Sequence, residues 1–423
     1  MQTPSQTIAS AIPQILRELS VGGFANVSAS KEKSLTYSPM GEEVSVKERE
    51  NLSVSVTLVK EGRKASLQIA TADVGEIRSR LEAVARTLAY VTPDDDVSVP
   101  EIRDSVSADD RAFDFSSITS EMLVERFRNA KDFAYPEGVA IESFSIEAEE
   151  SERIFVNTFG AEKRYAKTAS HWGIELFLPT EEGGDVWYDS FSSPKFQDVS
   201  GADVAPIAER LVEMSRPVAA TFASGPATVA LEGGVFADFL DILMGAASAE
   251  SIRQKTTFLE TSDIGGKILP EGFSITSFAR MPDSAYGRVF DGEGITTGDL
   301  PVVEGGVLKN VFCDSKNAAK FKIPATGNPF PSNLSFDAPV RPEAIREAKF
   351  LFTNLMAFHT VDSISGKFAL EGEGFELKDG KRAGYVKNVA LSGNVKTLFS
   401  GLVAEVGNRR RYGNALLGDV VVK

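Results

Sequence analysis

Residues Leu52 to Val59 read Leu-Ser-Val-Ser-Val-Thr-Leu-Val, and this stretch of the 423-residue chain decides the fold class. Apolar and polar side chains alternate in it, which is the period-two pattern of a β-strand with one buried face. Glu61-Gly62 follows and predicts a tight turn into a second strand, Lys64–Ala70. The flanking segments Thr7–Leu19 and Val74–Tyr90 instead place apolar residues at helical spacing. Helix, strand meander and helix in succession indicate an α+β protein.

The rest of the first half continues this alternation. Helices are predicted at Ser120–Phe133 and Asp203–Ala220. Between them we expect a meander with strands at Ala140–Glu147, Arg153–Thr158, Arg164–His171, Ile174–Leu178 and Val186–Phe191. Ser224-Gly225-Pro226 then breaks the chain, so we place a domain boundary near residue 222. Residues 1–222 are expected to form an α+β domain with a mixed sheet and flanking helices.

Residues 223–423 are expected to form a β-rich domain that is barrel-like or sandwich-like. One helix is predicted early in it, at Val235–Ala247. Gly305-Gly306 and Asp379-Gly380 each indicate the turn of a β-hairpin. A last helix is predicted at Asn394–Glu405, with Gly407 as its stop.

Composition and charge exclude several classes of function. Lys and Arg number 45 against 60 Asp and Glu, which gives a formal charge of −15. Nucleic acids and anionic membranes need a cationic face, so neither is an expected partner. A single cysteine fits a reducing compartment, and the most apolar window, Val235–Ala249, is interrupted by Asp238 and Asp241. We therefore expect a cytoplasmic protein without a membrane span.

The residues that could bind metal are few. A helical zinc motif needs two histidines one turn apart, and the only two here, His171 and His359, are far apart in sequence. They could form a three-ligand site only if they converged with Cys313. The alternative interpretation is that all three are structural, with Cys313 packed as a small apolar residue.

Other catalytic motifs are not found in the sequence. It has no Gly-x-Ser-x-Gly elbow, no P-loop and no dinucleotide-binding glycine pattern. Asp238 and Asp241 would share one helix face, either as a solvated edge or as a pair of metal ligands. The densest basic stretch, Arg409-Arg410-Arg411, is a solvated loop or a contact for a carboxylate. Residue chemistry alone therefore shows no complete catalytic set.

A series of short motifs nonetheless follows the order seen in one known family. They are Asn157-Thr158-Phe159-Gly160, Phe290-Asp291-Gly292-Glu293-Gly294, Pro301–Asn310, Thr326-Gly327-Asn328, Ser332-Asn333-Leu334, Ser365-Gly366-Lys367-Phe368, Val389–Asn394 and Val406-Gly407-Asn408. In this order and spacing the chain resembles the TldD/PmbA family, also called modulator of DNA gyrase. The resemblance covers most of the chain.

The resemblance implies a fold and an activity. Family members have an N-terminal α+β domain and a C-terminal β-rich domain, and they assemble as dimers around an internal cavity. TldD and TldE (the latter also called PmbA) form a heterodimeric zinc peptidase that acts on unfolded peptides. The metal-bearing subunit carries His-Glu-x-x-x-His on a helix and a late cysteine ligand.

This chain departs from the family at that motif. The corresponding helix places Asp241, Ile242 and Ala246 where His, Glu and His are expected, and Tyr412–Gly418 contains no cysteine. Isoleucine cannot accept a proton and alanine cannot ligate zinc. The resemblance therefore implies no cofactor and no catalytic residue on this chain, with zinc on a TldD-like partner.

Two hypotheses follow. The first is a TldE/PmbA-like subunit without metal, paired with a TldD-like chain and holding unfolded peptides. The second is a homodimeric peptide-binding or assembly protein without peptidase activity. Candidate peptide or interface residues are Asp241, Asn333, Asn408 and Arg409. The net charge gives no support for direct contact with DNA, despite the gyrase label.

Overall fold

The computed structural model describes residues 3–39, 43–181 and 183–423. The first half contains α1 (Pro4–Glu18), β1 (Gly22–Ser38), β2 (Glu43–Lys60), β3 (Arg63–Ile69), α2 (Val74–Thr87), β4 (Val106–Asp110), α3 (Ser120–Lys131), β5 (Ala140–Asn157), β6 (Glu162–Leu178), β7 (Asp185–Ser193) and α4 (Gly201–Met214). The second half contains β8 (Val229–Leu231), α5 (Gly233–Ala246), α6 (Ala249–Gln254), β9 (Ser274–Phe278), β10 (Leu300–Glu304), β11 (Val307–Leu308), α7 (Ser315–Phe321), β12 (Asn333–Asp337), β13 (Phe350–Met356), β14 (Lys367–Lys378), β15 (Lys381–Asn394), α8 (Val395–Ser400), β16 (Leu402–Tyr412) and β17 (Ala415–Val422). Both halves combine helices with a sheet whose strand pairs are mostly antiparallel, so the predicted α+β class is confirmed.

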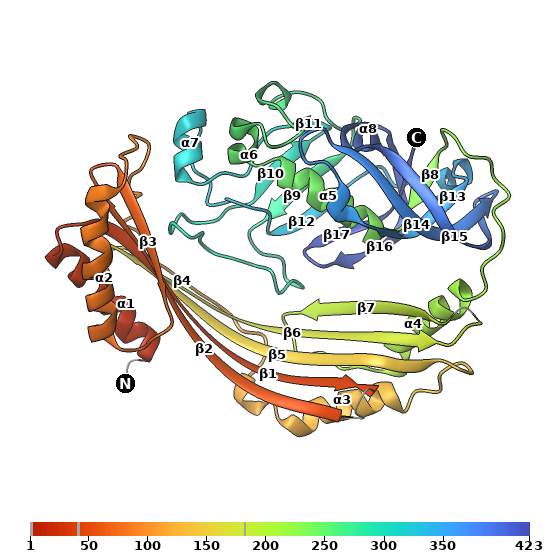
Figure 1. The fold of residues 1–423 in the computed structure, drawn as a ribbon, viewed down its shortest axis with the longest axis horizontal. Helices are drawn as coiled ribbons and strands as arrows, with labels where there is room; N and C mark the ends of the chain where they lie inside the picture. Colours follow the sequence, from red (N-terminus) through yellow and green to blue (C-terminus); the bar gives the residue numbers. More distant parts are fainter. Residues whose placement is uncertain (1–2, 40–42, 182) are drawn as a thin grey trace.

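The first half is built on a seven-stranded sheet. Its strand order is β3-β2-β1-β5-β6, and β4 and β7 share the outer side of β6. Every pair is antiparallel except β4 with β6. The long strands β1, β2, β5 and β6 form a curved half-barrel that passes beneath the second half (Figure 1).

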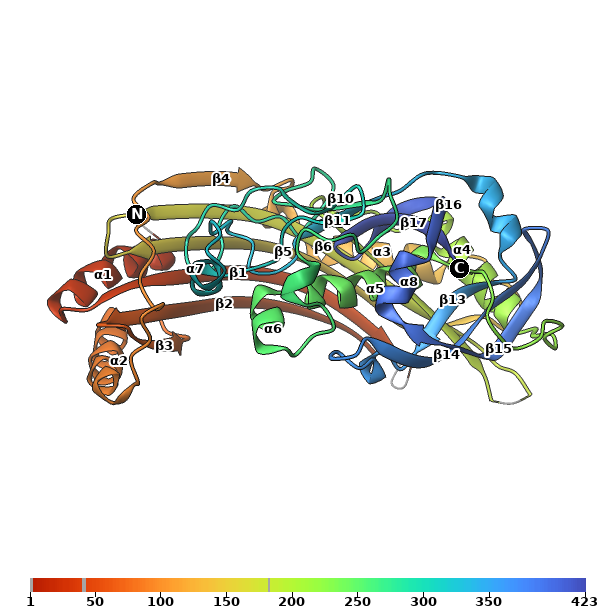
Figure 2. The same cartoon turned by 90° about the horizontal axis from the view of Figure 1, so that it is seen from above.

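Apolar helix faces cover this sheet. The side chain of Thr3 caps α1, and Ile8, Ile12 and Leu16 then lie on one buried face. They share a core with residues of α2 such as Leu81 and with alternate residues of β2 such as Val56. The helices α1 and α2 lie at one end of the sheet, and β13, β14 and β15 lie toward the other (Figure 2).

The strands β1 and β2 are longer than the sequence pattern predicts. Their far halves carry charges in place of alternating apolar residues, which hides the strand signal. Paired charges stabilise them across the ladder, with Lys31 opposite Glu50 and Lys33 opposite Glu48. A pattern based on burial cannot detect a strand of this kind.

The strands β5 and β6 are likewise continuous where shorter pieces were predicted. Gly173 suggests a break between the predicted strands Arg164–His171 and Ile174–Leu178, but it lies inside the ladder. A Cβ at this position would lie 2.7 Å from the hydroxyl oxygen of Tyr188. This glycine therefore leaves room for the side chain of Tyr188 to lie across the strand, and it does not mark a turn.

The second half is built on one ten-stranded sheet of mixed direction. Its order is β11-β10-β9-β12-β17-β8-β13-β14-β15, and β16 also pairs with β17. Two pairs are parallel, β12 with β17 and β8 with β13. The β-rich prediction is confirmed in this form. The expected barrel-like or sandwich-like form is not what the structure has. Within the described residues the strand path runs from β11 to β15 without closing, and it forms a single mixed sheet with α5 packed on it.

A hydrophobic cluster spans the two halves. Successive residues of β8 face opposite ways, so that Leu231 packs on α5 while Ala230 packs toward the first half. Leu351, Phe375 and Tyr385 join Ala230 in a cluster that includes residues of α3, α4, β5 and β6. The boundary near residue 222 stays a prediction.

The last predicted helix, Asn394–Glu405, is confirmed in its first half and wrong in its second. Residues Val395–Ser400 are helical, but Leu402–Tyr412 forms β16, and Gly407 lies inside this strand. Gly401 is the C-cap of the helix, and a Cβ there would lie 2.6 Å from the backbone oxygen of Lys423, so glycine allows the close approach of the chain end. Across the described residues, no helix combines the length and the apolar character that crossing a bilayer requires.

Candidate functional site

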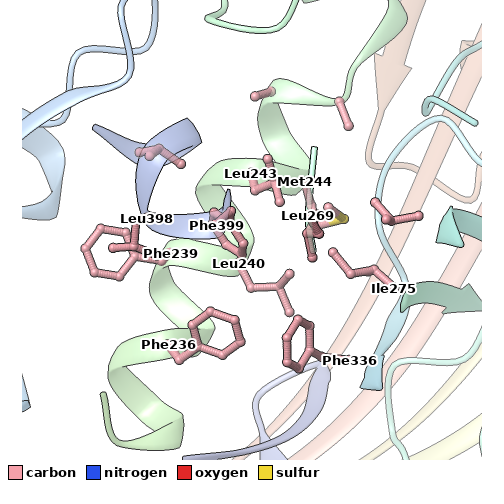
Figure 3. Packing of buried hydrophobic residues seen from close by; sticks show 14 of the residues in the cluster. Phe236, Phe239, Leu240, Leu243, Met244, Leu269, Ile275, Phe336, Leu398 and Phe399 are labelled. Carbon is pink, nitrogen blue, oxygen red and sulfur yellow. The ribbon is translucent and has the colours of Figure 1, made fainter. Parts of the chain in front are cut away.

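Helix α5 lies at the centre of the second half. Its backbone begins where the N–H of Gly233 donates to Oδ1 of Asp419 on β17, at 2.8 Å. Phe236, Phe239 and Leu240 then pack against residues of α8, β9 and β12, as Figure 3 shows. The helix is therefore fixed by its own core packing, and only a narrow stripe remains at the surface.

The three positions that the zinc motif would occupy differ in burial. Asp241 lies on the exposed stripe, Ile242 is half-buried and Ala246 is only 6% exposed. Among the residues that the structure describes, no three His, Cys, Asp or Glu side chains form a group that could hold a metal ion.

His171, His359 and Cys313 are accordingly not brought together. The Nδ1 atom of His171 lies 2.7 Å from the hydroxyl oxygen of Ser192 on the neighbouring strand. His359 lies in the short helical turn Phe358–Thr360, and Cys313 is buried. Burial raises the pKa of the Cys313 thiol to about 11, so this sulfur stays protonated at neutral pH.

Asn408 and Arg409 line a cavity of about 510 Å³ between the two halves of the chain. The Nδ2 atom of Asn408 donates to Oδ2 of Asp419 at 2.6 Å, and this asparagine adopts a left-handed backbone conformation. The guanidinium of Arg409 donates to Glu405 and Asp337 at 2.7 and 3.0 Å. Both side chains are therefore already engaged in contacts that fix β16.

Asn333 lies apart from these residues. It is fully buried at the start of β12, where its side-chain oxygen accepts from the hydroxyl of Ser284 and its Nδ2 donates to the carbonyl of Phe278. Asp241 lies on α5. The structure thus brings Asn408 and Arg409 into one cavity and leaves Asp241 and Asn333 elsewhere.

Two larger cavities lie between the N-terminal sheet and the segment around residues 279–299. Their volumes are about 840 and 570 Å³, and both are lined by Tyr165, Lys167, Gly287 and Arg288. The turn that begins at Asp291 closes the smaller cavity. Both cavities are larger than the one lined by Asn408 and Arg409.

The turn at Asp291 belongs to one of the motifs noted in the sequence, and its role is structural. Oδ1 of Asp291 accepts hydrogen bonds from the backbone N–H groups of Glu293 and Ile295, both at 2.9 Å. Burial raises the pKa of the Asp291 carboxyl to about 6. Gly294 has a φ of +81°, and a Cβ there would lie 2.2 Å from the ring of Phe155 on β5. The turn is thereby held tightly against the N-terminal sheet.

Sequence reasoning missed the basic residues of the smaller cavity. Arg153 and Lys167 come from β5 and β6, and Arg288 comes from the second half. No local pattern marks them, because the strand register and the packing of the two halves bring them together. The only signal available in the sequence was the alternation of side chains along a strand. It places Arg153 and Lys167 on the face of the sheet opposite to Glu152 and Ala166.

Comparison with known proteins identifies this architecture. Residues 224–423 match the model of the PmbA/TldA metallopeptidase C-terminal domain. This domain belongs to the PmbA/TldD family. Over 94% of its length it is 23% identical to the metalloprotease PmbA of Escherichia coli O157:H7, of which the match covers 90%. A PmbA homologue of Buchnera aphidicola is 27% identical over 192 residues, which are 44% of this chain and 42% of that protein.

Solved structures share the family fold along the whole chain. A proposed modulator of DNA gyrase from Bacteroides thetaiotaomicron superposes with a TM-score of 0.86 at 19% identity, covering 99% of this chain and 97% of that one. TldE from Thermococcus kodakarensis superposes with a TM-score of 0.81 at 17% identity, covering 98% of both chains. At these identities the likeness concerns the fold.

Proposed function

We propose that this chain is the metal-free TldE/PmbA-like subunit of a heterodimeric zinc peptidase. A TldD-like partner supplies the zinc ion, and this chain forms part of the chamber that holds an unfolded peptide. The observation that carries the proposal is the composition of α5, where the zinc motif of the family would lie.

The residues of α5 do not fit a zinc ion. Zinc needs nitrogen, sulfur or oxygen donors at about 2.0–2.3 Å. Asp241 offers one carboxylate, but the side chains of Ile242 and Ala246 are hydrocarbon. The methyl group of Ala246 is moreover packed in the core beside α5. No step through zinc is therefore assigned to this chain.

The cavities between the two halves support a role in holding peptides. The wall of the smaller cavity includes Ser28 and Ser30 of β1 and Asn51 and Ser53 of β2. These uncharged side chains can donate to and accept from a peptide backbone without selecting a side chain. Such contacts, like the addition of a peptide to a strand edge, would give a weak sequence preference.

Metal content tests the proposal directly. The chain is purified alone, without chelators or a histidine tag, and its zinc is measured by elemental analysis. A TldD-like chain prepared in the same way is the control. We expect no bound zinc on this chain and about one zinc on the control. About one zinc per chain of the protein described here would contradict the metal-free assignment.

Measurements of assembly and of activity test the proposed pairing with a TldD-like chain and the peptidase activity of the pair. We expect the two chains to form a heterodimer in analytical ultracentrifugation and to hydrolyse an unfolded peptide only when mixed. Chelator-sensitive hydrolysis by this chain alone would overturn the proposal. A stable homodimer that ignores the TldD-like chain and still binds peptides would instead favour a peptide-binding protein without peptidase activity.

A further inference from the structure

The cavity of about 570 Å³ has an unusual electrostatic environment. It is enclosed by β1, β2, β5 and β6 on one side and by residues around 286–292 and 330–332 on the other. Three half-buried cations, Arg153, Lys167 and Arg288, line it in a chain whose net charge is −15. Buried cations normally have a carboxylate in contact, because desolvating an unpaired charge is costly.

None of these three cations has such a partner in the part of the chain that the structure describes. The Nζ atom of Lys167 donates to the carbonyl of Ala285 at 2.7 Å. Nη2 of Arg288 donates to the carbonyls of Phe330 and Pro331 at 2.9 and 2.6 Å, while its Nη1 is buried and meets no acceptor. These contacts are to neutral oxygens, so none of them places a negative charge against the cations.

Arg153 is held in the same way. Its Nε and Nη2 atoms donate to Oδ1 of Asn26 at 3.0 and 2.7 Å, and Nη2 also approaches the backbone carbonyl of Asp291 at 3.3 Å. The guanidinium also lies over the ring of Phe290, at 5.4 Å from its centre. These contacts orient the side chain without neutralising its charge.

Nearby acids compensate these cations only in part. Glu149 is close enough to favour the charged form of Lys167, and Asp291 does the same for Arg153 and Arg288. Neither carboxylate forms an ion pair with them within the described residues. Glu152 adjoins the cavity, but its carboxylate accepts from Ser5 of α1 on the opposite face of the sheet.

The shifts in pKa agree with an excess of positive charge. Burial lowers the pKa of Arg288 to about 10, and the repulsion of Arg153 contributes to this shift. Burial, together with the charge of Arg288, also lowers the pKa of Lys167. The same burial raises the pKa of Glu149. An added anion would relieve this repulsion.

We propose that this cavity binds a carboxylate group of a peptide, held by Lys167 and Arg288 with Arg153 behind them. Ammonium and guanidinium groups form charge-assisted hydrogen bonds with carboxylates, and a guanidinium can do so bidentately. The serine and asparagine side chains of β1 and β2 lie along the same cavity and suit the adjoining peptide backbone. The carboxylate comes from the end of the peptide main chain or from an Asp or Glu side chain. The inference rests on the proposed peptide-holding function.

Binding of three fluorescent peptides to the full chain, measured by anisotropy, tests the inference. The first peptide is unstructured, lacks acidic residues and has a free C-terminus. The second has the same sequence with an amidated C-terminus. The third is this amide with one Glu in the middle of the sequence. We expect a peptide with a carboxylate to bind about tenfold more tightly than the plain amide. Since the net charge of −15 disfavours anions in general, such a preference reports a local site.

Substitutions locate the site. Lys167→Gln and Arg288→Gln should abolish the preference for the carboxylate, and Lys167→Arg should retain it because the charge remains. Arg164→Gln is the matched control, since Arg164 lies on the same strand with its side chain on the other face, paired with Glu162. If the peptide with the free C-terminus binds more tightly than the amide, the site binds the carboxylate at the end of the peptide main chain. If the amide with the central Glu binds more tightly, the site binds a side-chain carboxylate.

The outcomes separate the inference from the proposed function. If all three peptides bind equally and Lys167→Gln changes nothing, the carboxylate site is overturned while peptide holding stands. If no peptide binds, both are overturned. Thermal unfolding provides a second measurement, because removing an uncompensated charge should leave the midpoint of Lys167→Gln equal to or above that of the parent. A midpoint lowered by several degrees would show that Lys167 is structural and would overturn its assigned role.

Discussion

Asp419, near the end of the chain, accepts a hydrogen bond at 2.8 Å from the backbone N–H of Gly233, which lies 186 residues earlier at the start of α5. The carboxylate is 5% exposed and also accepts from Nδ2 of Asn408 at 2.6 Å. The last strand of the sheet thereby fixes the start of the central helix. An acceptor at a helix N-terminus satisfies a free N–H and interacts favourably with the helix dipole.

The first prediction concerns pH. Burial raises the pKa of Asp419 from its ordinary 3.8 to about 6, and it raises the pKa of Asp291 to the same value. The folded state therefore binds more protons than the unfolded state between about pH 4 and pH 6. In this window the free energy of unfolding falls as the pH rises, by about 3 kcal/mol for each group.

Urea denaturation at a series of pH values checks this prediction. Asp419→Asn keeps the size of the side chain and removes its titration, so it should flatten the slope between about pH 4 and pH 6. Asp283→Asn is the control, because Asp283 is exposed. A slope that Asp419→Asn leaves unchanged would show that this carboxyl does not cause it.

The second prediction concerns the core around α5. Phe239 is fully buried against the rings of Phe358 and Phe368. Phe239→Ala leaves a cavity and should lower the free energy of unfolding by about 3–5 kcal/mol. Asp241→Ala, two residues further along on the exposed stripe, should change it by less than about 0.5 kcal/mol. Guanidinium denaturation of both variants provides the comparison, and equal effects would contradict the packing described here.

The third prediction concerns a contact between the two halves. The side chain of Lys163 is 1% exposed, and its Nζ atom donates to Asp104 at 2.8 Å and to Thr296 at 2.7 Å. Lys163→Ala should lower the free energy of unfolding by about 1–3 kcal/mol, less than for a fully buried ion pair because Asp104 can be solvated. Lys309→Ala, at an exposed lysine, should have almost no effect on the same denaturation curve. If Lys163→Ala has an equally small effect, this contact does not contribute measurably to the stability of the interface between the two halves.

The fourth prediction separates two adjacent glycines. Gly305 and Gly306 form the turn between β10 and β11, with φ of +55° and +89°. A Cβ at Gly306 would lie 2.4 Å from the carbonyl oxygen of Leu269, whereas one at Gly305 would meet nothing within 4 Å. Gly306→Ala should therefore destabilise by about 2 kcal/mol or more, and Gly305→Asn by less than about 0.5 kcal/mol. Thermal unfolding of the two variants compares them, and a reversed order would contradict this turn geometry.

The turns were the part of the fold that the sequence predicts best. Glu61-Gly62, Gly305-Gly306 and Asp379-Gly380 all have positive φ at both residues and join antiparallel strands, as predicted. This geometry is encoded locally, because few residues tolerate a left-handed backbone. Residues close in sequence are sufficient to predict it.

Features that depend on distant partners were not predictable. The spacing of Leu398, Phe399 and Leu402 resembles a helix, but β17 pairs with the chain from Leu402 onward and makes it a strand. The cationic cavity was missed for the same reason, since Arg153 and Arg288 meet only after the two halves pack together. Local spacing carries no information about such pairings.

The charged far half of β2 has a consequence for solubility. The strand β3 covers β2 only from Val54 onward, so within the described residues no strand pairs with the outer side of Glu43–Ser53. Free edges of this length invite other chains to add and polymerise. Here Lys47, Glu48, Arg49 and Glu50 alternate in sign along the edge, so an incoming strand would have to match each charge in register. The charges that pair across β1 and β2 thus also disfavour the addition of a further strand at this edge.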